Sequence, residues 1–475
     1  MVINHIPEPT LEFGSGRHVD IRFGLLDHGP QDVAQARRPD RIRVGVIGSS
    51  QTIENASSWL EKCAGHIPRK PGAKLNLFPE FPGFNPECCF RSSVVLDSSI
   101  THQVMPRDFT PLSDDWDYEK RIRHAAEVFA DGIVQLAEKS PDVVLLAMPS
   151  ELVALLAEAE EKRPATTSRL KLEFHDLVKG LSMKAGKPVQ LIRPSTYDPT
   201  KRRLEQDERS KLASLQDEAT RAWNFHTALY YKAGGFPYRV PRPETSFPTC
   251  FIGVTFYVSP DKSRVQTSVA NVFNERGHGL AVKGRDAALS KDDRQPHLSG
   301  ADAALLVEDC LKAYRSEHRT SPARVVIHKS SSFGDEEREG FLGGLKKANI
   351  EIFDLITLRR SSTRLFRKGY YPPLRGTWLQ FDESKHTLYT RGSVDFYQEY
   401  PGMYVPRSLD AEAAVLSVAP VDLMEEILVL SKTNWNNVQM DSTMPITIAA
   451  ARKVGDILRW LPDIPIPQQA YRFFM

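Results

Sequence analysis

A small set of side chains in the first half of the chain could bind a terminal phosphate. His175 and Lys179 are spaced i and i+4, so on a helix they share one face about one turn apart. Gln190 lies on the strand expected next, and Lys232 ends an expected helix that is rich in charged residues. Two ammonium groups, an amide N–H donor and an imidazole can all contact one phosphate. Each residue alone is more typical of a solvated surface, so the hypothesis depends on their convergence.

A basic stretch in the second half could contact a nucleic-acid backbone. Residues 358–376 contain no acidic residue, and aromatic side chains are interleaved with the cations. The cations are Arg359, Arg360, Arg364, Arg367, Lys368 and Arg375. Cations that neutralise phosphates and rings that stack are typical of single-strand channels. A solvated charged face is the alternative, but the lack of balancing acids favours backbone binding.

The elements around the first group alternate between strand and helix, after an extended arm over 1–40 with a short strand at 18–23. The strands are expected at 42–48, 142–148 and 188–193, and the helices at 53–63, 117–139, 151–162, 166–186 and 207–232. A proline-studded loop is expected over 67–111. This alternation predicts a parallel, doubly wound, Rossmann-like domain over 41–240, ending at the proline-rich stretch 236–244.

The second half, 241–475, opens with strands and then alternates. The strands are expected at 249–258, 267–273, 279–283, 324–328 and 351–358, and the helices at 301–316 and 335–348. A β-meander followed by βαβ elements predicts a mixed sheet of the ribonuclease H type. The predicted fold class is therefore α/β, with a Rossmann-like domain followed by a ribonuclease H-like domain.

Composition excludes several classes of protein. The 475 residues carry 62 Lys and Arg against 60 Asp and Glu, so any site for a polyanion must be local. The five cysteines never form a CxxC pair, which argues against a disulfide framework and a structural zinc. Neither a leader peptide nor an apolar run long enough to span a membrane is visible in the sequence. We therefore expect a cytoplasmic protein without membrane association.

The order of these motifs resembles the Argonaute family. His-x3-Lys, then Gln, then Lys-x-Gly-Gly is similar to the guide 5′-phosphate pocket of Argonaute MID domains. Further segments resemble PIWI domains: Ile252-Gly253-Val254, Val325 to Ser330, Lys432 to Asn437, Pro445 to Leu458, and the apolar end Tyr471 to Met475. The chain resembles a short prokaryotic Argonaute, with 41–240 as MID and 241–475 as PIWI, lacking the N and PAZ domains.

The resemblance also indicates where hydrolysis would occur. Slicing Argonautes hold two divalent cations with a set of acidic residues, since phosphodiester hydrolysis needs anionic oxygens around both metals. At three of those positions this sequence has Thr255, Ser330 and Arg452, which cannot take the place of carboxylates. The resemblance therefore implies a PIWI domain without catalytic residues. It also implies that the C-terminal carboxylate of Met475 holds a Mg²⁺ beside the guide phosphate.

The implied function is recognition guided by RNA. A 5′-phosphorylated guide RNA would pair with complementary single-stranded DNA, without cleavage. Short Argonautes of this kind work with an APAZ-containing effector, and a sirtuin-like, NAD-consuming partner is favoured over a TIR-like one. Target recognition would switch on that effector in a heterodimer that defends against phage and plasmids.

Two alternatives remain open at this point. One is an active slicer whose metal ligands are not recognisable in the sequence. The other is a metabolic α/β enzyme that binds a nucleotide at the turn after Gly45, although the third glycine of the usual motif is missing.

Overall fold

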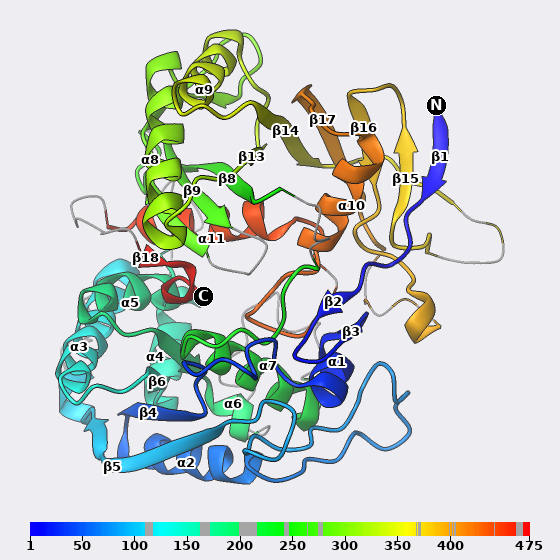
Figure 1. The fold of residues 1–475 in the computed structure, drawn as a ribbon. Coiled ribbons are helices and arrows are strands. Elements are labelled where there is room, and N and C mark those ends of the chain that lie inside the picture. Colours follow the sequence, from blue (N-terminus) through cyan, green and yellow to red (C-terminus); the bar gives the residue numbers. More distant parts are fainter. Residues whose placement is uncertain are drawn as a thin grey trace.

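The computed structural model places two α/β halves against each other, each built on its own sheet (Figure 1). The structure describes residues 1–109, 117–161, 172–198, 216–241, 247–263, 265–273, 279–366, 368, 372–398, 400, 402, 405–440, 442–461 and 469–475.

The first half contains a four-stranded parallel sheet in the order β5-β4-β6-β7. Its strands are β4 (Arg41–Gly48), β5 (Ser93–Gln103), β6 (Val143–Ala147) and β7 (Val189–Ile192). Its helices are α2 (Ser50–Cys63), α3 (Tyr118–Ala137), α4 (Ser150–Glu161), α5 (Phe174–Ser182), α6 (Pro194–Tyr197) and α7 (Glu218–Lys232). The prediction of a parallel, Rossmann-like arrangement is confirmed.

Strand β5 corrects the expectation of a loop over 67–111. It pairs in parallel with β4 at the edge of the sheet. Most of its side chains are half-buried or exposed, and the polar residues Asp97, Ser98 and Ser99 interrupt its apolar run. An edge strand of this kind lacks the continuous apolar pattern by which buried parallel strands are identified. The first part of the helix expected at 207–232 lies outside the described residues.

The N-terminal arm differs from the expectation of a strand at 18–23. Helix α1 (Ile21–His28) occupies most of that segment, and β3 (Arg17–His18) forms a short hairpin with β2 (Leu11–Glu12). The helix begins there because the Asp20 carboxylate accepts hydrogen bonds from the backbone N–H groups of Arg22 and Phe23. Further upstream, β1 (Val2–His5) pairs with a strand of the second half.

The second half is built on a mixed sheet in the order β1-β15-β16-β17-β14-β13-β8-β9-β10-β18. Its strands are β8 (Thr249–Val258), β9 (Val265–Phe273), β10 (Gly279–Lys283), β11 (Asp286–Leu289), β12 (Pro296–His297), β13 (Arg324–Lys329), β14 (Ile352–Arg360), β15 (Thr377–Gln380), β16 (Lys385–Leu388), β17 (Leu409–Val415) and β18 (Gln469–Ala470). Strands β8, β13 and β14 are parallel, and β9 and β17 flank them in the antiparallel sense. The predicted mixed sheet is confirmed.

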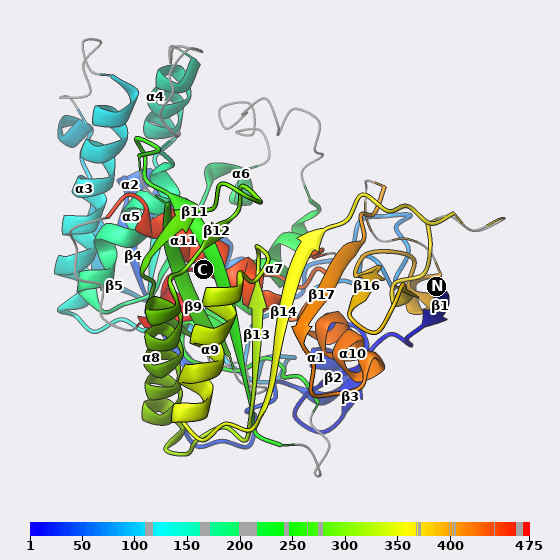
Figure 2. The ribbon, with the colours of Figure 1, turned by 90° about the horizontal axis from the view of Figure 1, so that it is seen from above.

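Helices cover both faces of this central sheet. One face packs against α8 (Gly300–His318) and α9 (Asp335–Lys347), which lie side by side (Figure 2). The opposite face packs against α10 (Pro420–Leu430) and α11 (Ile446–Leu458). Helix α11 also reaches the first half, where its residues Val454 and Ile457 join the core around β6 and α5.

One apolar core runs through both halves. Trp435 of the second half stacks on Tyr231 of α7, with ring centroids 5.0 Å apart. The last residues, Phe474 and Met475, are buried in the same core. The C-terminus therefore lies between the halves, next to α5 and α11 (Figure 1).

Candidate functional site

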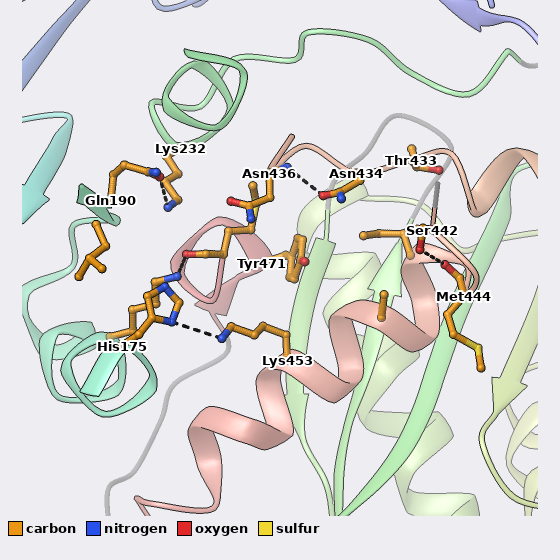
Figure 3. A pocket seen from close by; sticks show the side chains of 15 residues that line it. His175, Gln190, Lys232, Thr433, Asn434, Asn436, Ser442, Met444, Lys453 and Tyr471 are labelled. Atoms are coloured by element: carbon orange, nitrogen blue, oxygen red, sulfur yellow. Dashed lines mark hydrogen bonds between the residues drawn. The ribbon is translucent and has the colours of Figure 1, made fainter. Parts of the chain in front are cut away.

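A cavity of about 350 Å³ lies between the two halves. His175, Lys179, Gln190 and Lys232 all line it, so the structure brings together the four residues singled out from the first half (Figure 3). The second half contributes Thr433, Asn434, Asn436, Ser442, Met444, Ile446, Ala449, Lys453, Tyr471 and Met475. The site is therefore shared between the halves.

Three elements of the first half position the predicted residues. Helix α5 carries His175 and Lys179 one turn apart on the same face. Gln190 projects from β7, and Lys232 is the last residue of α7. Helix α7 begins at Asp217, whose carboxylate caps the backbone N–H of Thr220.

The two predicted lysines are almost completely buried. Lys232 is 2% exposed, and its Nζ donates to the carbonyl of Val189 at 3.0 Å and to the Gln190 amide oxygen. Lys179 is 4% exposed, and its Nζ donates to a terminal oxygen of Met475. Buried ammonium groups are costly unless anions or acceptors surround them. Both lysines have acceptors from the chain itself, and an anion in the cavity would add a further partner for each.

A third lysine completes the cluster and was missed by the sequence analysis. Lys453 of α11 points into the cavity, and its Nζ lies 3.4 Å from Nδ1 of His175 (Figure 3). It also donates to the carboxylate of Asp176. Only the fold brings α11 against α5, so no local sequence signal identifies Lys453 as part of the site.

Burial and mutual repulsion shift the protonation of these groups. Burial and the nearby Lys453 lower the pKa of Lys232 to about 7. Burial together with Lys232 and Lys453 holds the pKa of Lys179 well below its ordinary value. Burial and the charge of Lys179 lower the pKa of His175 to about 3, so the imidazole is neutral at pH 7. A bound dianion would relieve this repulsion and favour the charged lysines.

The side chains of the described residues do not by themselves form a Mg²⁺ site. Magnesium requires several oxygen ligands, yet within the described residues no three His, Cys, Asp or Glu side chains come together to hold a metal. The terminal oxygen of Met475 already accepts from Lys179, and Asp176 accepts from Lys453. The Mg²⁺ expected at the C-terminal carboxylate therefore stays a prediction.

The structure separates the cations of the basic stretch 358–376 into exposed ones and ones that are paired within the chain. Arg360, Arg364 and Lys368 are exposed, whereas Arg359 is half-buried and pairs with Glu412 of β17 at 3.1 Å. The acid that balances Arg359 thus comes from a neighbouring strand, where the local sequence does not show it. Arg367 lies outside the described residues.

Arg375 must be removed from the proposed backbone-contacting set. Its side chain is only 1% exposed, and its Nε donates to the Glu8 carboxylate at 2.8 Å. Its Nη2 donates to the Leu428 carbonyl and the Ser431 hydroxyl. Arg375 therefore fastens the N-terminal arm to the second half and presents no charge to solvent.

Three residues occupy the positions where the resemblance puts the metal-binding acids of a slicing enzyme. They lie near the ends of β8 and β13 and on α11. Thr255 is a buried residue of β8. Ser330 follows β13, and its backbone N–H donates to the Val254 carbonyl at 3.1 Å. Arg452 is an exposed residue of α11.

Gly45 does not form a nucleotide-binding turn, because it lies inside β4. Gly48 ends that strand, and a Cβ there would lie 2.5 Å from the carbonyl oxygen of Ala147. The second glycine thus permits close packing of β4 on β6. The alternative of a metabolic enzyme depended on a nucleotide-binding turn at this position, and the structure does not have that turn.

Comparison with solved structures identifies the fold. Clostridium butyricum Argonaute bound to a guide DNA and a target DNA superposes with a TM-score of 0.65 at 15% identity, covering 97% of this chain and 53% of that chain. Aa-Ago with externally bound siRNA gives a TM-score of 0.61 at 14% identity, covering 99% and 56%. The chain has the fold of Argonaute proteins.

A third Argonaute structure, from Marinitoga piezophila in complex with a 5′-OH guide RNA, gives a TM-score of 0.54 at 11% identity, covering 96% of this chain and 59% of that one. The chain therefore spans little more than half the length of these Argonautes. No family model and no curated protein matches the sequence. No helix within the described residues is long and apolar enough to cross a membrane.

Proposed function

We propose that the chain binds the 5′-phosphate end of a guide strand and recognises a complementary strand by base pairing, without cleaving it. One observation carries the proposal: in an Argonaute fold, three lysines from both halves converge with His175 and Gln190 on one cavity. Ammonium groups and amide donors in a buried cavity match a phosphate dianion. Sequence specificity would then come from the paired bases.

Each residue has a distinct role in this proposal. Lys179, Lys232 and Lys453 supply the charge, and Gln190 can turn its amide N–H toward the phosphate. His175 is neutral and half-exposed in the cavity, so it can stack on the first base or donate through Nε2. Beyond the pocket, Arg360, Arg364 and Lys368 are the exposed cations of the basic stretch that could follow the backbone.

Absence of cleavage is part of the proposal. Two divalent cations need several anionic oxygens, and the chain places Thr255, Ser330 and Arg452 where the resemblance puts three of the acids. A guanidinium at one of those positions repels a metal. An active slicer remains the alternative, and it would require ligands from other positions.

The nature of the strands and of the partner also belongs to the proposal. The similar structures hold DNA guides in one case and an RNA guide in another. From the resemblance to short prokaryotic Argonautes, we propose a guide RNA, a target of single-stranded DNA, and an APAZ-containing effector that is sirtuin-like and consumes NAD. Such a heterodimer would act in the cytoplasm as a defence against phage and plasmids.

A target-binding assay tests the proposed function. Protein loaded with a 5′-phosphorylated guide should retain a complementary strand and release a scrambled strand of equal length. With Mg²⁺ or Mn²⁺ present, the retained target should stay intact during prolonged incubation. Retention of both strands alike would contradict guided recognition, and cleavage of the matched target would establish the slicer alternative.

A further inference from the structure

Three parallel strands of the second half end at one edge of the sheet. In the strand register, Val254 of β8 lies opposite Lys329 of β13, and Lys329 lies opposite Thr357 of β14. Thr255 and Ser330 come immediately after the paired residues on the first two strands, and Arg360 ends the third. The carboxyl ends of parallel strands are where α/β proteins commonly bind ligands.

The pleat of the sheet decides which of these residues face α11. A Cβ on Gly253 would lie 2.1 Å from the Thr447 carbonyl oxygen, and His328 Nδ1 lies 2.8 Å from Thr447 Oγ1, so both residues face the start of α11. Side chains two positions apart on a strand share a face. Thr255 and Ser330, each two residues further along, therefore face α11 as well.

The same alternation separates the two neighbouring arginines of β14. Ile356 lies opposite His328 in the register, so Ile356 and Arg360 belong to the α11 face. Arg359 belongs to the other face, where it pairs with Glu412. Arg360 is exposed, and the described residues offer its guanidinium no hydrogen bond or ion pair.

Helix α11 brings a second cation to this edge. Arg452 is exposed and likewise has no hydrogen bond or ion pair with a described residue. Ile448, one turn before Arg452 on α11, belongs to the same apolar cluster as the buried residues of β14 that precede Arg360. In keeping with this placement, partial burial and the charge of Arg360 lower the pKa of Arg452. Among the described residues, Asp456 is the acid that acts on Arg452, and its carboxylate is paired with Arg459. Two like charges therefore lie at the same edge of the sheet, and neither forms an ion pair with a described residue.

We propose that Arg360 and Arg452 together bind one backbone phosphodiester of a nucleic acid, and that their guanidinium groups supply there the positive charge that a slicing enzyme obtains from divalent cations. The inference rests on the proposed function and extends it to this edge of the sheet. Guanidinium groups bind phosphate through paired N–H donors and remain charged at every working pH. An anion between them would also offset their mutual repulsion.

The phosphodiester could belong to the guide or to the target, so the test has two arms. Wild-type protein and the Arg360→Ala/Arg452→Ala variant are compared for binding of a 5′-phosphorylated guide, and then, once loaded, for binding of its complement. EDTA is present throughout, so that the charge must come from the protein. Arg338→Ala serves as the control, because this half-buried arginine lies on α9, which packs on the opposite face of the sheet.

The double variant should bind at least about tenfold more weakly in one arm, and the magnitude of the slope of log affinity against log salt should fall by about one, as expected for one phosphate. The arm that weakens identifies the strand. Arg360→Lys/Arg452→Lys should recover part of the loss, since lysine keeps the charge but not the paired donors. Affinities within about twofold of Arg338→Ala in both arms would overturn the inference. Failure of the wild-type protein to distinguish a matched from a scrambled target would instead remove the proposed function.

Discussion

Lys453 of α11 reaches across the interface between the halves, so that its Nζ lies 3.4 Å from Nδ1 of His175 on α5. Because Lys453 also donates to Asp176, this side chain of the second half connects α11 to α5 at the wall of the shared cavity. The packing of α11 against α5 therefore determines how much positive charge the cavity holds.

Replacing Lys453 should weaken phosphate binding. We expect Lys453→Met to reduce affinity for a 5′-phosphorylated oligonucleotide by about tenfold or more, because a charge-assisted hydrogen bond contributes about 1.5 to 3 kcal/mol. Asp176→Asn should have the opposite effect, since it removes the carboxylate that competes for Lys453. Fluorescence anisotropy measures both, and a 5′-OH oligonucleotide provides the baseline. Equal losses for the two 5′ ends would contradict the assignment of Lys453.

The affinity for a 5′-phosphate should depend on pH through Lys232. Its pKa in the empty cavity is about 7, so it is increasingly neutral above that pH and must take up a proton to bind a dianion. Affinity should therefore fall as pH rises from about 7 to 9, by up to about tenfold per unit for one lysine. Below about pH 6 the phosphate itself becomes a monoanion, which also weakens binding.

The Lys232→Met variant is the control for this titration. It removes the group that titrates while keeping an apolar chain of similar length. Its affinity should be lower than that of the wild-type protein at pH 7 and should vary less between pH 7 and 9. An unchanged pH profile in this variant would assign the proton uptake to another group.

Arg375 should affect stability and leave nucleic-acid binding intact. It pairs with Glu8, which also accepts from Lys432 at 2.8 Å; both cations are buried, and the Glu8 side chain is only 13% exposed. Arg375→Ala leaves Glu8 with one partner, so we expect the free energy of unfolding to fall by about 3 to 5 kcal/mol. Arg364→Ala, at an exposed position, should change stability little. Urea unfolding measures both, and similar values for the two variants would contradict the structural role of Arg375.

Divalent cations should matter little for the 5′ end. Three lysines already line the cavity, and the terminal oxygen of Met475 accepts from Lys179. Affinity for a 5′-phosphorylated guide should thus be the same within about twofold in EDTA and in Mg²⁺. A much tighter complex in Mg²⁺ would support the metal expected at the C-terminal carboxylate.

The sequence predicted the helices and strands that a local pattern of apolar residues identifies. The buried strand β6 has a continuous apolar run, β13 has an apolar centre at 325–327, and α9 lies almost where its periodicity placed it. Strand β5 escaped detection because its polar edge residues carry no such pattern. Helix α1 replaced a predicted strand because the Asp20 cap outweighs a short alternating pattern.

The same distinction applies to the site. His175, Lys179, Gln190 and Lys232 were found from their order along the chain, and the cavity brings them together. Lys453 was missed, and Arg375 was misplaced on the surface, because both depend on contacts between segments far apart in sequence. Net charge in a sequence window cannot show that Glu8 or Glu412 neutralises an arginine from another strand or arm.

The most direct measurement compares two guides that differ only in their 5′ end. Wild-type protein should bind the 5′-phosphorylated strand at least about tenfold more tightly than the 5′-OH strand, as expected for several charge-assisted contacts. In the Lys179→Met/Lys232→Met variant this difference should shrink to the part that Lys453 supplies, while the affinity for the 5′-OH strand stays the same. Equal affinities of the wild-type protein for both strands would contradict the central claim that the cavity holds a guide's terminal phosphate.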